Sequence, residues 1–154
     1  MRQKKQDTYG VAMNLKNTYP RSPREMMHGL VHIPRMIDKA QAYKEKNMGE
    51  YIYPCPLDKI ILNFIRAGED EFANFVSSHD ENQILDWIKE KCQNRNKTEK
   101  DFINQQILGR SPDGKERWDY FYEIRNKIDP SRTDISTWVD LIDLEEGRHL
   151  PSVT

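Results

Sequence analysis

The sequence has few of the features that would place the protein in an oxidising compartment or in a membrane. Only two cysteines, Cys55 and Cys92, occur in 154 residues, so no disulfide framework is expected. The longest apolar run, at residues 60–62, is far too short to cross a membrane. The first ten residues, MRQKKQDTYG, lack the apolar segment of a secretory signal peptide. We therefore expect a reduced, soluble, cytoplasmic protein.

Strong net charge and strand-like alternation are missing as well. The formal net charge is −1 at pH 7, so the chain as a whole has no strong attraction for nucleic acid or for a membrane surface. No segment alternates apolar and polar residues over a useful length, and no repeat of solenoid length occurs. Aromatic residues make up 10% of the chain, which argues against disorder. We expect a folded protein and no nucleic-acid binding.

What the sequence does contain is apolar residues at helical spacing. Helices are expected at about 22–29, 34–49, 58–67, 69–78, 80–92, 98–109, 113–128 and 132–147. We expect an all-α fold, a compact single domain of about seven or eight short helices over residues 13–154. A flexible N-terminal tail is expected at residues 1–12.

Particular residues predict where these helices begin and end. Ser22 followed by proline is typical of a helix start, and Gly29 of a helix end. Thr98 is expected to cap the helix that follows it. Pro54 and Pro56 exclude a helix in the stretch GEYIYPC, which we expect to be extended.

Charge is distributed unevenly along the chain. Residues 1–48 contain ten Lys and Arg against four Asp and Glu, whereas residues 49–154 contain 14 against 21. One interpretation is that the two regions attract each other, within one fold or across a dimer. The other is a local anion-binding site in the basic third. The residues leave both interpretations open.

Four cations form the candidate anion site: Arg21, Arg24, Arg35 and Lys39. Arg35 and Lys39 are four residues apart and lie on one edge of their expected helix. Arg21 and Arg24 flank an expected helix start, where free N–H groups suit anions. Arginine can hold a phosphate or a carboxylate through two hydrogen bonds. The alternative is that each cation pairs with a carboxylate of the chain.

Three tyrosines are candidates for the walls of this site: Tyr43, Tyr51 and Tyr53. Tyr43 falls on the apolar stripe of its helix, and Tyr51 and Tyr53 point the same way in an extended segment. Tyrosine combines an apolar ring with a polar tip, which suits the lining of a pocket. Packing in the core is the alternative.

Cysteine and histidine supply the candidates for catalysis or metal binding. Cys55 comes just before a helix expected at Asp58, and a helix start or a nearby base lowers the pKa of a thiol. His28 and His32 have the spacing of a metal-binding pair, but a glycine and a proline interrupt their helix. Cys55 and Asp58 could complete a ligand set only by tertiary contact. We expect no metal site, and the sequence leaves open which cofactor, if any, the protein uses.

The C-terminal segment DLIDLEEGR is acidic. Asp140, Asp143, Glu145 and Glu146 surround an apolar stripe. Carboxylates late in a helix oppose the helix dipole, so we expect them to meet cations within the chain or across a dimer. A carboxylate pair for metal or acid–base chemistry is the alternative.

Four blocks of the sequence resemble a known family. They are YPRSPRE, GLVHIPRMIDKA and GEYIYPCPLD, in this order and spacing, and later DPSRTDISTWVDLIDLEEG. Together they resemble the bacterial family catalogued as domain of unknown function 5069, from about residue 14 to near the C-terminus. The resemblance implies a small, stand-alone bacterial protein, and it carries no activity or catalytic residue with it.

The sequence supports three functional hypotheses. The first is binding of an anionic small molecule, or of an anionic peptide group, by the four cations. The second is a protein–protein interaction or structural module in the form of a homodimer. The third is an enzyme that uses Cys55 or a histidine-containing site.

Overall fold

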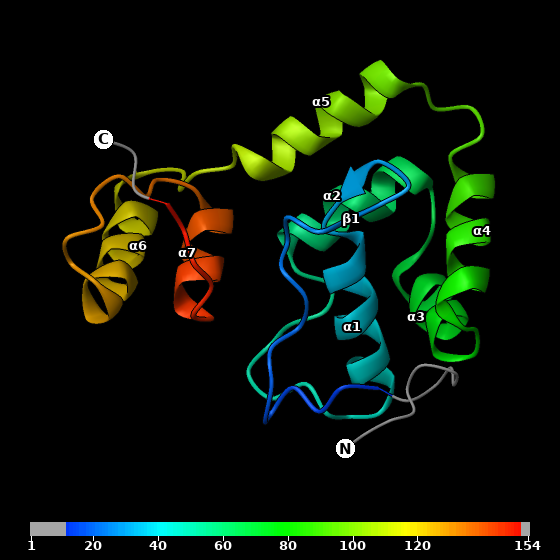
Figure 1. Ribbon diagram of the computed structural model, residues 1–154, viewed down its shortest axis with the longest axis horizontal. Helices are drawn as coiled ribbons and strands as arrows, with labels where there is room; N and C mark the ends of the chain where they lie inside the picture. The colour runs from blue at the N-terminus through cyan, green and yellow to red at the C-terminus, as the bar shows by residue number, and fades with distance from the viewer. Residues whose placement is uncertain (1–11, 152–154) are drawn as a thin grey trace.

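The computed structural model describes residues 12–151, and helices dominate this part of the chain (Figure 1). The elements are the strands β1 (Met26–Met27) and β2 (Leu30–Val31) and the helices α1 (Ile33–Lys44), α2 (Pro56–Ile65), α3 (Glu69–Ser77), α4 (Glu81–Lys91), α5 (Lys97–Leu108), α6 (Lys115–Ile128) and α7 (Trp138–Glu145). The expected all-α class is confirmed, with seven helices and one tiny hairpin between residues 12 and 151. The tail prediction falls almost entirely on residues 1–11, which lie outside the described residues.

The prediction of a helix at residues 22–29 is wrong, because this segment leads into the antiparallel β1–β2 hairpin. The turn residues His28 and Gly29 have φ angles of 54° and 77°. Two consecutive residues with positive φ form the tight turn that suits a two-residue hairpin loop. Ser22 caps no helix, and its hydroxyl donates a hydrogen bond to Asp143 of α7 instead.

Other predicted boundaries differ from the structure by a few residues. α2 begins at Pro56, because proline suits a first helical position where the N–H is not needed. α5 is capped by Asn96 and not by Thr98. α7 begins only after Thr137, whose side chain accepts a hydrogen bond from the first turn. The stretch at 49–55 contains no helix, as expected.

The main hydrophobic core lies around α1. α1 packs against α3, and α5 packs against both β2 and α2. The first five helices each contribute at least one side chain with no exposed surface, including Ile37, Ile61, Phe72, Ile84 and Ile107. Burial of a side chain of this size stabilises the fold by about 1.5–3 kcal/mol. Both α1 and α2 contribute to this core, and Lys39 of α1 pairs with Asp58 of α2.

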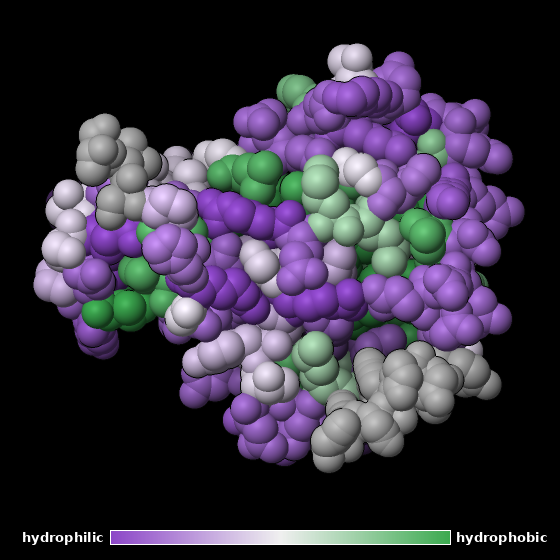
Figure 2. All heavy atoms as spheres, in the orientation of Figure 1, coloured by the Kyte–Doolittle hydropathy of each residue, from purple (hydrophilic) through white to green (hydrophobic). Residues whose placement is uncertain are grey.

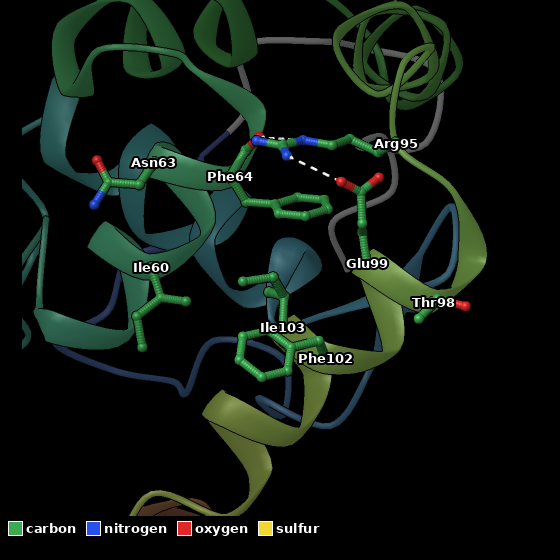
Figure 3. Close-up of a pocket in the computed structure, with 8 residues that line it drawn as sticks. All are labelled: Ile60, Asn63, Phe64, Arg95, Thr98, Glu99, Phe102 and Ile103. Carbon is green, nitrogen blue, oxygen red and sulfur yellow. Dashed lines mark hydrogen bonds and ion pairs between the residues drawn. The ribbon is translucent and has the colours of Figure 1, made fainter.

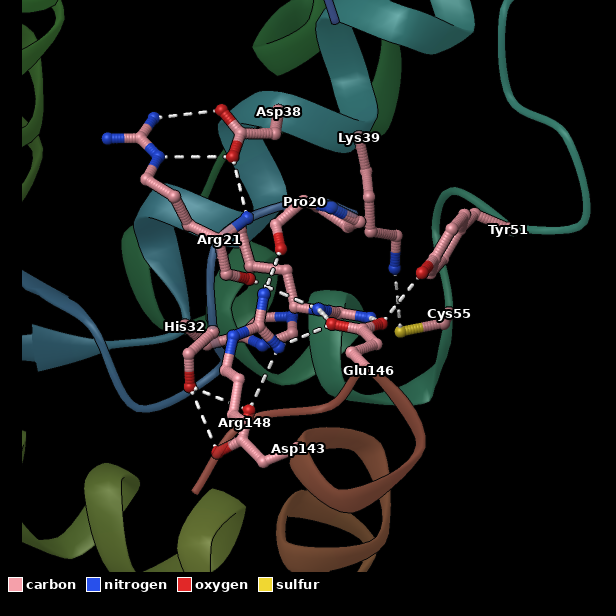
Figure 4. A network of polar contacts seen from close by, with 12 residues as sticks. Pro20, Arg21, His32, Asp38, Lys39, Tyr51, Cys55, Asp143, Glu146 and Arg148 are labelled. Carbon is pink, nitrogen blue, oxygen red and sulfur yellow. Dashed lines mark hydrogen bonds and ion pairs between the residues drawn. The ribbon is translucent and has the colours of Figure 1, made fainter. Parts of the chain in front are cut away.

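α6 and α7 lie side by side at one end of the molecule and share a smaller core (Figure 1). Phe121 and Leu141 are buried there, and Trp118 and Trp138 pack against them. The rings of Phe121 and Trp138 meet edge to face, with centroids 5.3 Å apart. Figure 4 shows the carboxylates of Asp143, in α7, and of Glu146, the residue after α7. They pair with Arg24 and Arg35 of the basic N-terminal third.

The face shown in Figure 2 is mostly hydrophilic, with separate hydrophobic patches. Scattered exposed apolar side chains of this kind are normal for a folded protein. In the part of the chain that the structure describes, no helix has the length and apolar character needed to cross a bilayer.

Candidate functional site

Each of the four cations predicted to form an anion site pairs with a carboxylate of the chain. Arg21 pairs with Asp38 and Glu81, Arg24 with Asp140 and Asp143, Arg35 with Glu146, and Lys39 with Asp58. The expectation that the acidic C-terminal segment meets cations of the basic third is therefore confirmed within the chain for Asp140, Asp143 and Glu146, whereas Glu145 forms no ion pair among the described residues. Anion binding by the four cations together stays a prediction.

A cavity of about 470 Å³ lies at the N-terminal ends of α1 and α2. Its lining includes His32, Arg35, Lys39, Tyr51 and Cys55. The structure thus brings together half of the predicted basic cluster, one predicted tyrosine and the predicted reactive cysteine. We call this space the Cys55 cavity.

The remaining predicted site residues lie elsewhere. Arg24 lines a different cavity. Tyr53 is buried, and its hydroxyl donates to the backbone carbonyl of Glu69 at 2.7 Å. Tyr43 packs against Tyr53, with ring centroids 5.4 Å apart. These two tyrosines belong to the packing of the α1 end and do not line the Cys55 cavity.

Arg35 and Glu146 form a two-pronged ion pair on one wall of the Cys55 cavity. Their two hydrogen bonds are 2.9 and 2.8 Å long, and each side chain is only 5% exposed. The hydroxyl of Tyr51 donates to the same carboxylate at 2.7 Å, and Arg148 pairs with it as well (Figure 4). Burial raises the pKa of Glu146, but these donors outweigh burial and hold its pKa below the usual value.

Two helix starts position the potentially reactive side chains. Cys55 immediately precedes α2, and its backbone N–H donates to Asp58 in the first turn at 2.8 Å. His32 immediately precedes α1 and has a φ of 76°, in the left-handed region. For a residue other than glycine this conformation costs about 1–3 kcal/mol. It is maintained here because the imidazole is fully buried against Asp58.

Four polar side chains meet at this point: His32, Lys39, Cys55 and Asp58. The Nε2 of His32 lies 2.7 Å from one oxygen of Asp58, and the Nζ of Lys39 donates to the other oxygen at 2.7 Å. Lys39 also donates to the Sγ of Cys55 at 3.2 Å (Figure 4). Cys55 is partly exposed, whereas the other three side chains are buried. The Nδ1 of His32 has no hydrogen-bond partner among the described residues.

These contacts shift the proton equilibria of the thiol and the imidazole in opposite directions. Burial and the charge of Asp58 raise the pKa of Cys55, but the interaction with His32 and the charge of Lys39 outweigh them and lower it. Burial lowers the pKa of His32, whereas the hydrogen bond with Asp58 raises it and prevails. Both shifts favour transfer of the thiol proton of Cys55 to the imidazole of His32.

Asp58 keeps its negative charge in spite of complete burial. Burial raises the pKa of its carboxyl, but hydrogen bonds and charges from His32 and Lys39 hold that pKa well below the usual range. The carboxylate is therefore the counterion of the Lys39 ammonium, and of the His32 imidazole when that ring is protonated.

The same residues contain a potential set of metal ligands. One donor atom each of His32, Cys55 and Asp58 lies within 4.8 Å of the others, and imidazole, thiolate and carboxylate are all ligands of zinc. Lys39, however, donates to two of these three donors, so an ammonium already supplies positive charge at this position. His28 lies in the hairpin turn and is not part of the set. The predicted lack of a metal site stays a prediction.

A second cavity, of about 640 Å³, lies between α2 and α5 (Figure 3). Ile60, Phe64, Phe102 and Ile103 form most of its wall. Arg95 donates to the backbone carbonyl of Phe64 at 2.9 Å and lies 4.3 Å from the centroid of its ring. Its lining contains no cysteine or histidine, so it is less suited to catalysis than the Cys55 cavity.

Some residues of the Cys55 cavity were missed by sequence reasoning. Lys39 was expected to bind an anion, and its contact with Cys55 was not foreseen. Glu50 and Tyr120 also line the cavity, and no local pattern indicates this. The contact between Cys55 and Asp58 could have been predicted from the sequence, because an acidic residue three positions after a helix cap has the spacing of a capping box.

Comparison with known proteins agrees with the resemblance found in the sequence. The family model described as Domain of unknown function (DUF5069) matches residues 17–148 of the 154-residue chain. No curated protein gave a significant match. The chemistry of the site is therefore inferred from its own residues.

Proposed function

We propose that this chain, which belongs to the DUF5069 family, is an enzyme that uses the Cys55 thiolate as its nucleophile. The observation that carries the proposal is the 3.2 Å hydrogen bond from Lys39 to the Cys55 sulfur, at the wall of a cavity that also contains a buried histidine. A cysteine reacts as the thiolate, and nearby cations favour that form. A cysteine that serves only for packing needs none of these contacts.

Each member of the cluster has a role in this proposal. Lys39 stabilises the thiolate by its charge. His32 holds the proton that leaves the thiol, in agreement with its raised pKa. Asp58 bonds to both the imidazole and the ammonium and thereby orients them. A nucleophile, a base and an orienting carboxylate are the kinds of group that nucleophilic enzymes use.

The reaction class that fits is group transfer from an electrophilic carbon. The Cys55 thiolate attacks an acyl-type carbon, and a sulfur–carbon bond forms as the bond to the leaving group breaks. The His32 imidazolium donates its proton to the leaving group. The neutral imidazole then accepts a proton from the water that attacks the same carbon, and the sulfur–carbon bond breaks to release the product and restore the Cys55 thiolate. A cavity of about 470 Å³ suits a small molecule.

An activated ester tests the nucleophile. We expect p-nitrophenyl acetate to release nitrophenolate in a burst of about one equivalent per chain, followed by slower turnover. Cys55→Ser should abolish the burst, whereas Cys92→Ser, a change of a buried thiol at the end of α4, should retain it. Mass spectrometry should place the acetyl group on Cys55. A burst of the same size in Cys55→Ser would rule the proposal out.

Binding of an anionic small molecule, without catalysis, is the second candidate function. It is favoured by the presence of Arg35, Lys39 and Tyr51 in the lining of one cavity. An anion would have to compete with the carboxylates that already bind both cations. Thermal unfolding in inorganic phosphate or citrate tests this function. A rise in the unfolding temperature that Arg35→Gln removes supports it, and no rise at millimolar concentrations opposes it.

A further inference from the structure

We propose that the Cys55 cavity accepts substrates with a positively charged group, which Glu50 and Glu145 bind at its rim. This inference rests on the proposed function of Cys55 and specifies the substrate class of the same site. The substrate is a small molecule that carries an ammonium or guanidinium group on an aliphatic chain, together with the electrophilic carbon that the thiolate attacks.

The buried charges of the cavity wall compensate each other. Arg35 is bound through two hydrogen bonds by Glu146. Lys39 is bound by Asp58 at 2.7 Å. Both pairs are almost completely buried, so neither cation is free to attract an anionic ligand unless its own carboxylate is displaced.

Two carboxylates of the lining remain without such compensation. Glu50 and Glu145 are exposed residues, and within the described residues neither forms an ion pair. The pKa of Glu145 is raised, first by burial and then by the negative charges of Glu146 and Glu50. The positive charge of Arg35 opposes this rise and does not cancel it. A cation bound between Glu50 and Glu145 would relieve the repulsion that these like charges create.

Apolar side chains at the same rim favour a cation with an aliphatic body. Ile52 and Tyr120 line the cavity and are 68% and 57% exposed. The face of a tyrosine ring attracts an ammonium or guanidinium group, and an isoleucine packs against methylene groups. A phosphate or a carboxylate would instead meet repulsion from Glu50 and Glu145.

A buried polar atom points independently to a guest in this cavity. His32 has no exposed surface, lines the cavity, and leaves its Nδ1 without a hydrogen-bond partner among residues 12–151. Buried polar atoms of proteins almost always have a partner. A polar atom of the substrate next to the Cys55 sulfur would supply the missing hydrogen-bond partner of the His32 Nδ1.

Methanethiosulfonate reagents of opposite charge measure the preference of the cavity. The Cys55 thiolate attacks the sulfenyl sulfur, a disulfide forms, and methanesulfinate leaves with the electron pair of the broken bond. The rate constant for the trimethylammonioethyl reagent is divided by that for the sulfonatoethyl reagent, in a Cys92→Ser background. Free 2-mercaptoethanol provides the reference ratio. At low salt we expect the ratio for Cys55 to exceed the reference on the order of tenfold.

Charge-neutral variants test whether the two glutamates cause this preference. Glu50→Gln combined with Glu145→Gln should return the ratio to the reference value, because the other charges of the wall compensate each other. The matched control is Glu90→Gln combined with Glu123→Gln, two exposed glutamates outside the cavity lining, and it should keep the wild-type ratio. Thermal unfolding by circular dichroism checks that all variants are folded.

The outcomes separate this inference from the proposed function. A wild-type ratio equal to the reference, or one in favour of the sulfonatoethyl reagent, overturns the cationic substrate and leaves the Cys55 nucleophile standing. Preference for the sulfonate is what anion binding by Arg35 and Lys39 predicts. The neutral reagent methyl methanethiosulfonate tests the nucleophile alone. If the rate constant for this reagent rises with pH only around the pKa of an ordinary thiol, the proposal that Cys55 is an activated nucleophile is overturned. The inference on the substrate class is then overturned with it.

Discussion

Asp58 is the residue on which the Cys55 cluster depends most. It is fully buried, yet it accepts hydrogen bonds from Lys39 and from the backbone of Cys55, and it pairs with His32. A buried carboxylate is tolerated only when donors of this kind surround it. Without its charge, the ammonium of Lys39 would remain buried with no carboxylate counterion.

Asp58→Asn should therefore lower the free energy of unfolding by about 3–5 kcal/mol, the usual cost of breaking a buried ion pair from one side. Urea unfolding followed by tryptophan fluorescence measures this change. Asp101→Asn is the control, because Asp101 belongs to an exposed ion pair with Lys97 and its loss should have little effect. Equal stability losses in the two variants would contradict the role given to Asp58.

At this scale the sequence could identify some members of the site and not others. Cys55 and Asp58 are three residues apart at a helix start, so their contact follows from local geometry. Lys39 lies in α1 and His32 immediately precedes it, and their approach to Cys55 depends on how α1 and α2 are placed relative to each other. Local spacing carries no information on that packing.

Among the elements, helices with a strong apolar period were predictable and the hairpin was not. The segment at 22–29 has a serine, a proline and a glycine in the order typical of a short helix. The same residue types are typical of turns. Side chains from other segments decide between the two, since Ser22 bonds to α7 and Met27 is buried in the main core.

The turn of the hairpin should be sensitive to Gly29→Ala. A Cβ at this position would meet only Lys100, at an ordinary distance of 3.7 Å, so the effect comes from the φ of 77°. We expect a loss of about 1–2 kcal/mol in the free energy of unfolding. His28→Asn is the control in the same turn, since asparagine tolerates positive φ, and it should leave stability unchanged or slightly higher. A neutral Gly29→Ala would show that the turn has another conformation.

On the scale of the whole molecule, ion pairs connect the small α6–α7 core to the main core. Arg24 and Arg35 reach α7 and the residue after it from the N-terminal third. The basic N-terminal third and the acidic remainder of the sequence thus attract each other within one chain.

A homodimer joined by basic and acidic faces stays a prediction. Sedimentation at low and at high salt tests it. Dimers that dissociate at high salt support it, and a monomer at both salt concentrations opposes it.

Acid should destabilise the protein through these buried carboxylates. The pKa values of Asp58 and Glu146 are both lowered in the folded chain, so each carboxyl binds fewer protons when folded than when unfolded. Their stabilising contribution is present above the ordinary carboxyl pKa of about 4 and is lost as the pH falls below it. Urea unfolding between pH 5 and pH 3 should show this loss, with a shallower slope in Glu146→Gln. Constant stability over this range would contradict it.

We propose that His32 and Lys39 lower the pKa of the Cys55 thiol and so favour its thiolate form. The most direct measurement is the ultraviolet absorbance of the thiolate as a function of pH in a Cys92→Ser background. We expect a pKa for Cys55 below the ordinary thiol value of about 8.5. Lys39→Met should raise it, and Lys59→Met, a change of an exposed lysine in α2, should leave it in place. A pKa for Cys55 at or above the ordinary value, unaffected by Lys39→Met, would contradict the account.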